Sequence, residues 1–336
     1  MTMTERDIGR DLRAAASRAV LAPSVHNTQP WRFVATPDSL EIHADPSRQL
    51  SVLDPTGRQL HLSLGCALFN ARVSLAAADL AVAVSRLPDP SRPNLVARLQ
   101  VNPTGFTDRV IAGLDDVISL RQTNRRRFEP EAVPPDLVEI LVAAAQVEDC
   151  LLCEVVDADD RLALARLSQR ADTLQLTEAA YRAELRSWTS NDPERRDGVW
   201  AAAVPHVDGT SGDEIPVRDF DTQGAGRLPA QTRSSANQCL LILGTEVDSP
   251  LAWLRAGEAL ERIWLEITRA GYVASLFTQV IEVAPARVQL RDELRLGVQP
   301  HVVLRVGRAP ITAATMRQHL QDVLDVRDKP DFVTHQ

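Results

Sequence analysis

Two long helical segments of related sequence constrain the fold of this chain more than any other feature. In residues 60–78, leucine and alanine recur at helical spacing and alanine occurs on every face, which is typical of a buried helix. Residues 252–270 carry a second apolar stripe, which ends at Gly271. Residues 65–68 (GCAL) lie 192 positions before residues 257–260 (GEAL). This offset indicates a duplicated unit, in which each copy is built around one long helix.

Length, composition and charge narrow the class of protein. A chain of 336 residues fits two domains or one duplicated domain. Its content of 44% hydrophobic and 24% charged residues is typical of a soluble globular protein, and its net charge of −8 argues against nucleic acid as the main partner. No apolar run is long enough to span a membrane, and the acidic N-terminus is unlike a signal peptide. The small number of cysteines, four in 336 residues, favours a reducing, cytoplasmic compartment.

Residues 22–33 (APSVHNTQPWRF) form an unusual polar segment. The two prolines exclude a helix interior and a central strand. Between them lie five residues that donate or accept hydrogen bonds: Ser24, His26, Asn27, Thr28 and Gln29. The apolar residues that follow alternate as a strand entering a core does. The segment therefore predicts a rigid polar loop, which suits the polar edge of a planar heterocycle. An ordinary helix-to-strand loop is the alternative, and the residue types alone do not decide between the two.

Residues 121–128 (RQTNRRRF) form a second informative segment, with four arginines in seven positions. The planar guanidinium fork of arginine can donate two parallel hydrogen bonds to a phosphate. The alternative is a solvated basic cluster at a helix C-terminus, where cations are favoured in any case. Taken alone, the segment favours this alternative.

Together, the two segments resemble the nitroreductase family. The Pro-Ser-x-x-Asn-x-Gln-Pro-Trp run at 23–31 is similar to the flavin-edge loop of that family, whose members bind FMN and are usually dimers. Arg121, Thr123 and Arg125 match its phosphate-binding motif, Arg-x-Ser/Thr-x-Arg-x-x-Phe. In an ordinary member the arginine motif comes first, whereas here it follows the loop. Duplication explains this order if each half has kept one motif and lost the other. Such an order resembles the Acg group of actinobacterial nitroreductase-like flavoproteins, over nearly the whole chain.

The resemblance implies an α+β, nitroreductase-like fold of two fused pseudo-repeats, residues 1–105 and 106–336. One chain would then imitate the usual dimer and hold one FMN, so that a monomer is sufficient for the site. Residues 188–236 contain several glycine and proline breaks and little periodicity. A segment of this kind is usually a lid and otherwise disordered. The resemblance favours a lid over the flavin, because the matching part of an ordinary member lies close to the cofactor.

The cofactor-binding residues implied by the resemblance fall into three groups. The flavin-edge loop contributes Pro23, Ser24, His26, Asn27 and Gln29. The phosphate clamp consists of Arg121, Thr123 and Arg125, completed by Arg317 near the C-terminus. The turn beside flavin N5 comprises Ser275, Phe277 and Thr278. Because Phe277 is bulkier than the usual residue, we expect it to narrow the substrate space.

The implied activity is that of an FMN-dependent NAD(P)H oxidoreductase. NAD(P)H would give a hydride to flavin N5 and leave, and a nitro or quinone-like acceptor would then enter the same space. The flavin itself performs this chemistry, so neither a catalytic side chain nor a metal is required. The alternative is a protein that binds and sequesters FMN with little or no reductase activity, because its site is closed to the nicotinamide. A protein without flavin is disfavoured, since both motifs are intact.

The remaining patterns predict local structure. Cys150 and Cys153 form a Cys-x-x-Cys pair, but residues 151–156 read as a strand and no second pair lies at metal-ligand spacing, so we interpret both as core cysteines. Helices are predicted over 6–21, 108–121, 134–145 and 161–187, and strands over 31–35, 40–43, 94–101, 151–156, 238–244 and 302–306.

Overall fold

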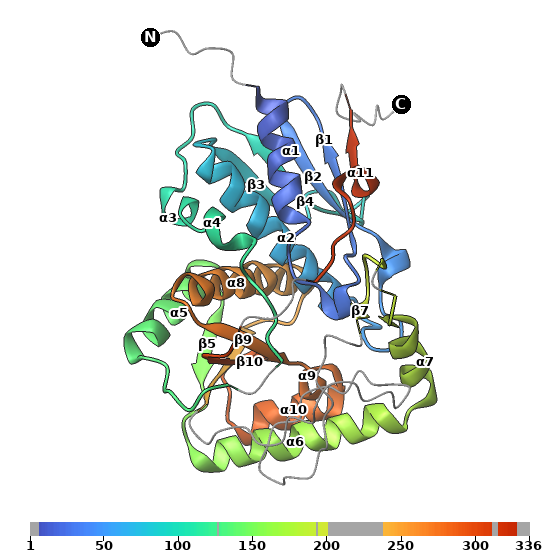
Figure 1. The fold of residues 1–336 in the computed structure, drawn as a ribbon, viewed down its shortest axis with the longest axis vertical. Coiled ribbons are helices and arrows are strands. Elements are labelled where there is room, and N and C mark those ends of the chain that lie inside the picture. The colour runs from blue at the N-terminus through green and yellow to red at the C-terminus, as the bar shows by residue number, and fades with distance from the viewer. Residues whose placement is uncertain (1–6, 126–127, 193, 201–237, 311–314, 328–336) are drawn as a thin grey trace.

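The first half of the chain contains two helices and one sheet. The computed structural model describes residues 7–125, 128–192, 194–200, 238–310 and 315–327 (Figure 1). The elements of the first half are α1 (Ile8–Ala19), the short turn η1 (Val25–Asn27), β1 (Trp31–Ala35), β2 (Ser39–Ala44), η2 (Pro46–Arg48), α2 (Arg58–Ala77), β3 (Val82–Arg86) and β4 (Leu95–Val101). Strands β1, β2, β4 and β3 lie side by side in that order, and each neighbouring pair is antiparallel.

The second half repeats this arrangement with insertions. Its elements are α5 (Pro135–Val147), β5 (Leu151–Glu154), α6 (Ala158–Thr177), α7 (Ala179–Ser187), β6 (Thr189–Ser190), β7 (Val199–Trp200), β8 (Cys239–Thr245), α8 (Pro250–Arg269), β9 (Val273–Phe277), α9 (Gln279–Glu282), α10 (Ala284–Glu293) and β10 (Gln299–Gly307). Its main sheet has the order β5-β8-β10-β9 and is again antiparallel throughout.

The two halves therefore share one topology. In each, a helix precedes the first strand, and a helix of 20 residues connects the second strand to the third (α2 and α8). A duplicated unit would give this order. The boundary predicted between residues 105 and 106 stays a prediction. The helices just beyond it, α3 (Arg109–Ala112) and α4 (Asp115–Ile118), pack on α2 of the first half.

Two glycines let α2 and α8 cross at close range in the middle of the molecule (Figure 1). A Cβ atom on Gly65 would overlap the carbonyl oxygen of Leu254 and lie 2.8 Å from Cα of Gly257. A Cβ atom on Gly257 would overlap the carbonyl oxygen of Leu62 and lie 2.8 Å from Cα of Gly65. Leu62 and Leu254 are also 192 residues apart, so the contacts are reciprocal, as across a two-fold axis.

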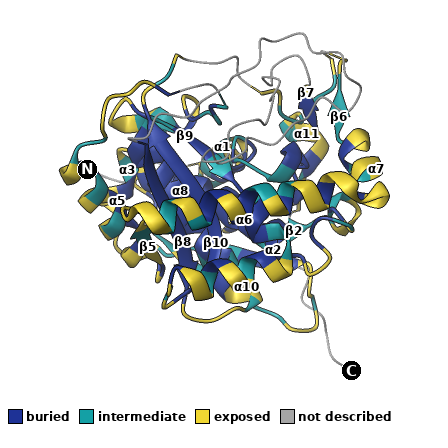
Figure 2. Ribbon diagram, turned by 90° about the horizontal axis from the view of Figure 1, so that it is seen from below, coloured by how far each residue is buried: buried dark blue, intermediate teal, exposed yellow. Residues whose placement is uncertain are grey.

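Side chains from both halves form one apolar core around this crossing. It includes Leu64 and Leu68 of α2, Ile263 of α8, Trp31 of β1 and Val302 of β10. Figure 2 shows β8, β10 and α8 as buried, whereas α6 and α10 expose their outer faces. Helix α2 is long and apolar enough to cross a membrane by composition, but 83% of that window is buried inside the protein, as in a core helix.

The C-terminal segment crosses back to the first half. After the short helix α11 (Leu320–Val323), strand β11 (Leu324–Val326) pairs in parallel with β1, with Phe33 opposite Leu324. The first sheet thus has five strands, and its outermost strand comes from the end of the chain. The sequence did not predict this strand, because it is only three residues long.

Several local predictions need correction. The helix predicted over 108–121 is two short helices, α3 and α4, which are separated around Gly113. The helix predicted over 161–187 is divided at Glu178, whose backbone is extended. Most of the lid predicted over 188–236, namely residues 193 and 201–236, lies outside the described residues, so the lid stays a prediction. Cys150 is buried, Cys153 is half-buried, and all four cysteines are free.

Replacing Gly65 by alanine tests the helix crossing. Because the new methyl group would overlap the Leu254 carbonyl, Gly65→Ala should lower the free energy of unfolding by about 3 kcal/mol or more. Gly113→Ala is the matched control, because Gly113 has a φ of −69° and no atom near its would-be Cβ, and it should change stability by less than about 0.5 kcal/mol. Urea unfolding measures both. Equal effects of the two variants would contradict the close crossing.

Candidate functional site

One pocket lies between the two halves and draws on both. It collects six of the residues expected at the cofactor site: Pro23, Ser24, His26, Thr123, Arg125 and Thr278. The other lining residues were not anticipated and are Val25, Gln59, Leu62, Ser63, Cys66, Leu260, Leu276, Gln279 and Val302. The loop and α2 come from the first half, and the arginine segment, α8, β9 and β10 come from the second. The structure thus brings the two separate sequence motifs to one place.

The loop is held in an unusual backbone conformation. His26, Asn27 and Gln29 have φ values of 48°, 54° and 51°, in the left-handed region that residues other than glycine seldom adopt. Such residues cost about 1–3 kcal/mol each and cluster at functional sites. Two hydroxyl groups support the loop, since Ser24 Oγ accepts from the Gln29 N–H (2.9 Å) and Ser63 Oγ accepts from the Val25 N–H (3.3 Å).

The side chains of Asn27 and Gln29 do not line the pocket but connect the loop to two distant segments. Asn27 Nδ2 donates to the carbonyl oxygens of Gly198 and Met316, both at 3.1 Å. The side-chain amide of Gln29 contacts the same two segments. Its Nε2 donates to a backbone carbonyl of the first segment, and its Oε1 accepts a backbone N–H from the second, each at 2.8 Å. These amides hold parts of the chain that lie about 170 and 290 positions further along.

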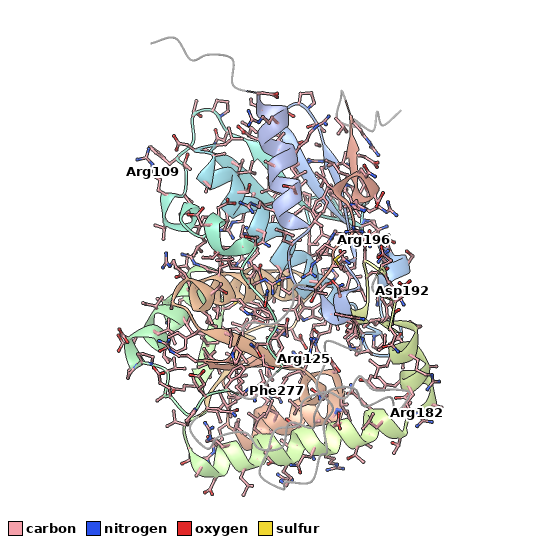
Figure 3. The ribbon with its side chains drawn as sticks, viewed as in Figure 1. Arg109, Arg125, Arg182, Asp192, Arg196 and Phe277 are labelled. Carbon is pink, nitrogen blue, oxygen red and sulfur yellow. The ribbon has the colours of Figure 1, made fainter. Side chains whose placement is uncertain are left out.

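The arginine segment lies against the edge of the second sheet. Thr123 forms an isolated parallel bridge with Ala274 of β9, and the Asn124 N–H donates to the Ala274 carbonyl at 2.9 Å. Through these contacts Thr123 and Arg125 reach the pocket wall. Arg125, which is labelled in Figure 3, lines the pocket. Arg126 and Arg127 lie outside the described residues.

Arg121 and Arg317 lie at the start of the loop and not among the pocket-lining residues. Arg121 Nη2 donates to the Leu21 carbonyl (3.1 Å), its Nε lies 3.2 Å from Oε1 of Glu261, and its guanidinium stacks 4.8 Å from the ring centroid of Trp264. Arg317 donates to the same Leu21 carbonyl at 3.5 Å. Burial, together with the nearby Arg121 charge, lowers the pKa of Arg317 to about 9. Their role as phosphate ligands stays a prediction.

Glu261 of α8 is the acidic partner of these arginines and was not foreseen. Its side chain is fully buried, and burial raises its pKa to about 7, against the opposing effects of Arg121, Asn70 and Arg317. A buried carboxyl is costly unless it is paired, so the two arginines and Glu261 belong to one electrostatic unit.

The side chain of Phe277 does not narrow the pocket, contrary to our expectation. Successive side chains of a strand point to opposite faces, and in β9 it is Leu276 that faces the pocket. Phe277 packs in a buried cluster with Val280 and Val303, and its ring centroid lies 5.3 Å from Cζ of Arg305. Ser275 is on the same side of the strand as Phe277. Whether their backbone groups contact a cofactor stays a prediction.

Three polar residues of α2 line the pocket and were missed in the sequence. Gln59, Ser63 and Cys66 follow the spacing i, i+4, i+7, so polar positions on one face of an otherwise apolar helix were the available signal. Gln59 is 6% exposed, and its Nε2 finds no hydrogen-bond acceptor among the described residues. Burial raises the pKa of the Cys66 thiol well above its usual value, so this thiol stays neutral and is unsuited to act as a nucleophile. The described residues contain no group of His, Cys, Asp and Glu arranged to hold a metal ion.

Curated relatives match almost the full length of the chain. A protein of Mycobacterium tuberculosis named "Putative NAD(P)H nitroreductase" is 34% identical over 319 residues, which cover 94% of this chain and 91% of the relative. A second protein of that organism, "Putative NAD(P)H nitroreductase acg", is 31% identical over 336 residues and 98% of both chains. No family model matches the chain.

Solved structures resemble the chain more remotely. The FMN-dependent nitroreductase NfnB from Mycobacterium smegmatis, in complex with NADPH, has 18% identity and a TM-score of 0.38, covering 63% of this chain and 97% of that chain. A protein from Anabaena variabilis described as "a putative nitroreductase" has 11% identity and a TM-score of 0.45, covering 90% of this chain and 88% of that chain. TM-scores below 0.5 do not establish a common fold, so the relationship rests on the sequence relatives.

Removing the Asn27 amide tests whether the loop depends on its distant contacts. Asn27→Ala leaves the Gly198 and Met316 carbonyls without their donor and places alanine in a left-handed conformation, so it should cost about 1–3 kcal/mol of unfolding free energy. Gln100→Ala, which removes one exposed hydrogen bond to the Asp38 carbonyl, is the control and should cost less than about 0.5 kcal/mol. If urea unfolding gives the same loss for both, the loop does not depend on this amide.

Proposed function

The chain belongs to the nitroreductase family, within its Acg-like group, and from this we propose that it binds one FMN between its two halves and acts as an NAD(P)H oxidoreductase. The observation that carries the proposal is the convergence of the Pro23–His26 loop with Thr123 and Arg125 on one pocket. These segments are about 100 residues apart in sequence and come from different halves. A pocket built in this way corresponds to the interface site that a dimer of separate units would form.

The chemistry of the pocket wall fits a flavin. Polar groups of Ser24, Gln59 and Thr278 stand among apolar side chains, which is the usual composition of a site for a planar cofactor. The amide nitrogen of Gln59 is a buried hydrogen-bond donor that has no acceptor among the described residues. A carbonyl oxygen or ring nitrogen of the cofactor would accept this hydrogen bond. Arg125 adds a positive charge at the wall.

We assign the residues to three tasks. Pro23, Ser24 and His26 bind the polar edge of the ring, with Asn27 and Gln29 fixing the loop behind them. Arg121, Thr123, Arg125 and Arg317 hold the phosphate. Ser275, Phe277 and Thr278 provide the backbone turn near the reactive nitrogen. FMN, when bound, supplies the redox chemistry: it accepts a hydride from NAD(P)H and delivers two electrons to a nitro or quinone-like acceptor. Cationic and N–H groups at the ring edge would stabilise the negative charge of the reduced cofactor.

The asymmetry of the two halves supports a single site per chain. At the 192-residue offset, the pocket residue Cys66 corresponds to Glu258 on α8. Glu258 is fully buried and pairs with Arg72 (2.7 Å) and Arg86 (2.5 Å). Charged side chains therefore fill the space around Glu258, at the position equivalent to the pocket. We propose residues 1–105 and 106–336 as the two pseudo-repeats, with the single site between them.

A second candidate function is the storage of FMN without turnover. The observation that favours it is the attachment of residues 196–198 to the loop through the amides of Asn27 and Gln29. Arg48 strengthens this attachment, because it donates both to the Thr28 carbonyl and to Asp197. A chain segment held against the loop would limit the space that a nicotinamide needs.

Mixing the purified protein with NADPH distinguishes the two candidates. If the protein is a reductase, its visible flavin absorption band should bleach on mixing without oxygen and return when a quinone or nitro compound is added. The control is the same protein reduced chemically with dithionite, which shows the full extent of bleaching. A flavin that dithionite reduces but NADPH does not would overturn the reductase proposal and favour storage.

Arg121→Ala tests the phosphate assignment. Losing one charge-assisted contact should weaken FMN binding about ten- to a hundredfold and leave riboflavin, which has no phosphate, nearly unaffected. Arg109→Ala is the control, because the side chain of Arg109 is 84% exposed, far from the pocket (Figure 3). Fluorescence titration measures both affinities. If the wild type binds riboflavin as tightly as FMN, the phosphate assignment is wrong.

A further inference from the structure

Three charged groups from distant parts of the chain meet at the start of the polar loop. Arg121 and Arg317 both donate to the Leu21 carbonyl, at 3.1 and 3.5 Å, and Arg317 also donates to the Ala22 carbonyl at 3.3 Å. Glu261 lies 3.2 Å from Arg121 Nε. Two guanidinium groups thus face one carboxylate, which leaves one positive charge in excess when Glu261 is ionised.

The carboxylate is a weak partner for these cations. Glu261 is fully buried, yet its contact with Arg121 Nε is not an aligned hydrogen bond, and Asn70 of α2 is a further polar group that acts to lower its pKa. Good salt bridges of this kind are bidentate, with two parallel N–H···O bonds. The Arg121–Glu261 contact is therefore mainly electrostatic, and the cluster retains donor capacity for a second anion.

The cluster adjoins the pocket wall along three segments of the chain. Glu261 follows Leu260, Arg121 precedes Thr123, and the Leu21 carbonyl precedes Pro23, and each of these neighbours lines the pocket. A ligand in the pocket with an anionic tail near the loop would therefore approach both arginines and Glu261 together.

We propose that Glu261 is a positioning residue that serves as the resident counter-ion of the Arg121–Arg317 pair and competes with the phosphate of the bound cofactor. This inference rests on the proposed FMN site. When no phosphate is present, Glu261 compensates the two buried cations and keeps them in place. When a phosphate binds, the carboxylate opposes it, so Glu261 limits how strongly the site prefers a phosphorylated ligand over a neutral one.

The groups that face Glu261 determine its protonation. Two of these groups are cations, Arg121 between α4 and α5 and Arg317 in the C-terminal segment. The other two are Cys66 and Asn70 of α2. Cys66 stays a neutral thiol, so the two arginines are the charges that keep Glu261 ionised. A phosphate that neutralises them should raise the Glu261 pKa further, and the protein should then take up a proton.

The first test compares Glu261→Gln with Glu258→Gln. Glu258 is a matched control, because it is equally buried on α8 and is paired with two arginines, Arg72 and Arg86, without lining the pocket. We expect Glu261→Gln to bind FMN about tenfold more tightly than the wild type and to bind riboflavin with unchanged affinity. Glu258→Gln should leave the ratio of the two affinities unchanged. An unchanged or reduced ratio in Glu261→Gln would show that Glu261 has only a structural role and would overturn the inference.

A second test uses the wild-type protein and remains decisive if Glu261→Gln does not fold. Near pH 8 the phosphate of free FMN is already a dianion, since its second pKa is about 6. Calorimetric titrations in buffers of different ionisation enthalpy should then show proton uptake with FMN and none with riboflavin. Equal proton uptake with the two flavins would overturn the inference.

A third measurement separates this inference from the proposed function. If the wild type binds neither flavin, the FMN proposal fails, but inorganic phosphate still probes the arginine pair. Phosphate should raise the melting temperature of Glu261→Gln more than that of the wild type or of Glu258→Gln. The same shift in all three proteins would exclude a competing role for Glu261.

Discussion

The close approach of α2 and α8 is the constraint on which the rest of the structure depends. Neither helix can carry a side chain where Gly65 meets Gly257, because backbone atoms of the other helix already fill the space. The reciprocal contacts of Leu62 and Leu254 place an approximate two-fold axis at this point. One apolar core extends from this crossing through both halves. The pocket lies beside the crossing, because Cys66 on its wall is next to Gly65 in the sequence. The Cys66 thiol also donates a hydrogen bond to the Gly257 carbonyl.

The two sides of the crossing differ in how completely their buried charged side chains are hydrogen-bonded. On one side, two carboxylates and three guanidinium groups are joined by aligned hydrogen bonds, because Glu258 accepts from Arg72 and Arg86 and Glu148 accepts from Arg72 and Arg262. On the pocket side, Glu261 faces two arginines with incomplete hydrogen bonding. A fully hydrogen-bonded buried network is rigid, whereas a partly satisfied one retains donors that another anion can use. This difference is the physical reason that we propose for a single ligand site in one chain.

The local structure was largely predictable, because it depends on short-range patterns of residue types in the sequence. Apolar spacing located α1, α2, α5 and α8, and alternation located β1, β2 and β4, with boundaries that differ by a few residues. The failures have local causes as well. Gly113 interrupts the helix expected over 108–121, and an extended Glu178 divides the next long helix. Strand β11 has no pattern of its own, since it exists only through pairing with β1. The family prediction is confirmed by relatives that match nearly the whole chain.

The sequence by itself determined which elements form, the duplication offset and the two motifs that identify the family, because each depends on residue types at fixed spacing. Only the tertiary structure decided where the side chains of these motifs point. It directs the amides of Asn27 and Gln29 to distant backbone segments, turns Phe277 away from the pocket, and pairs Arg121 with Glu261, which is 140 residues further along the chain. It also brings Gln59 and Ser63 of α2 to the pocket wall. Such choices depend on contacts between residues far apart in sequence, and no local period encodes them.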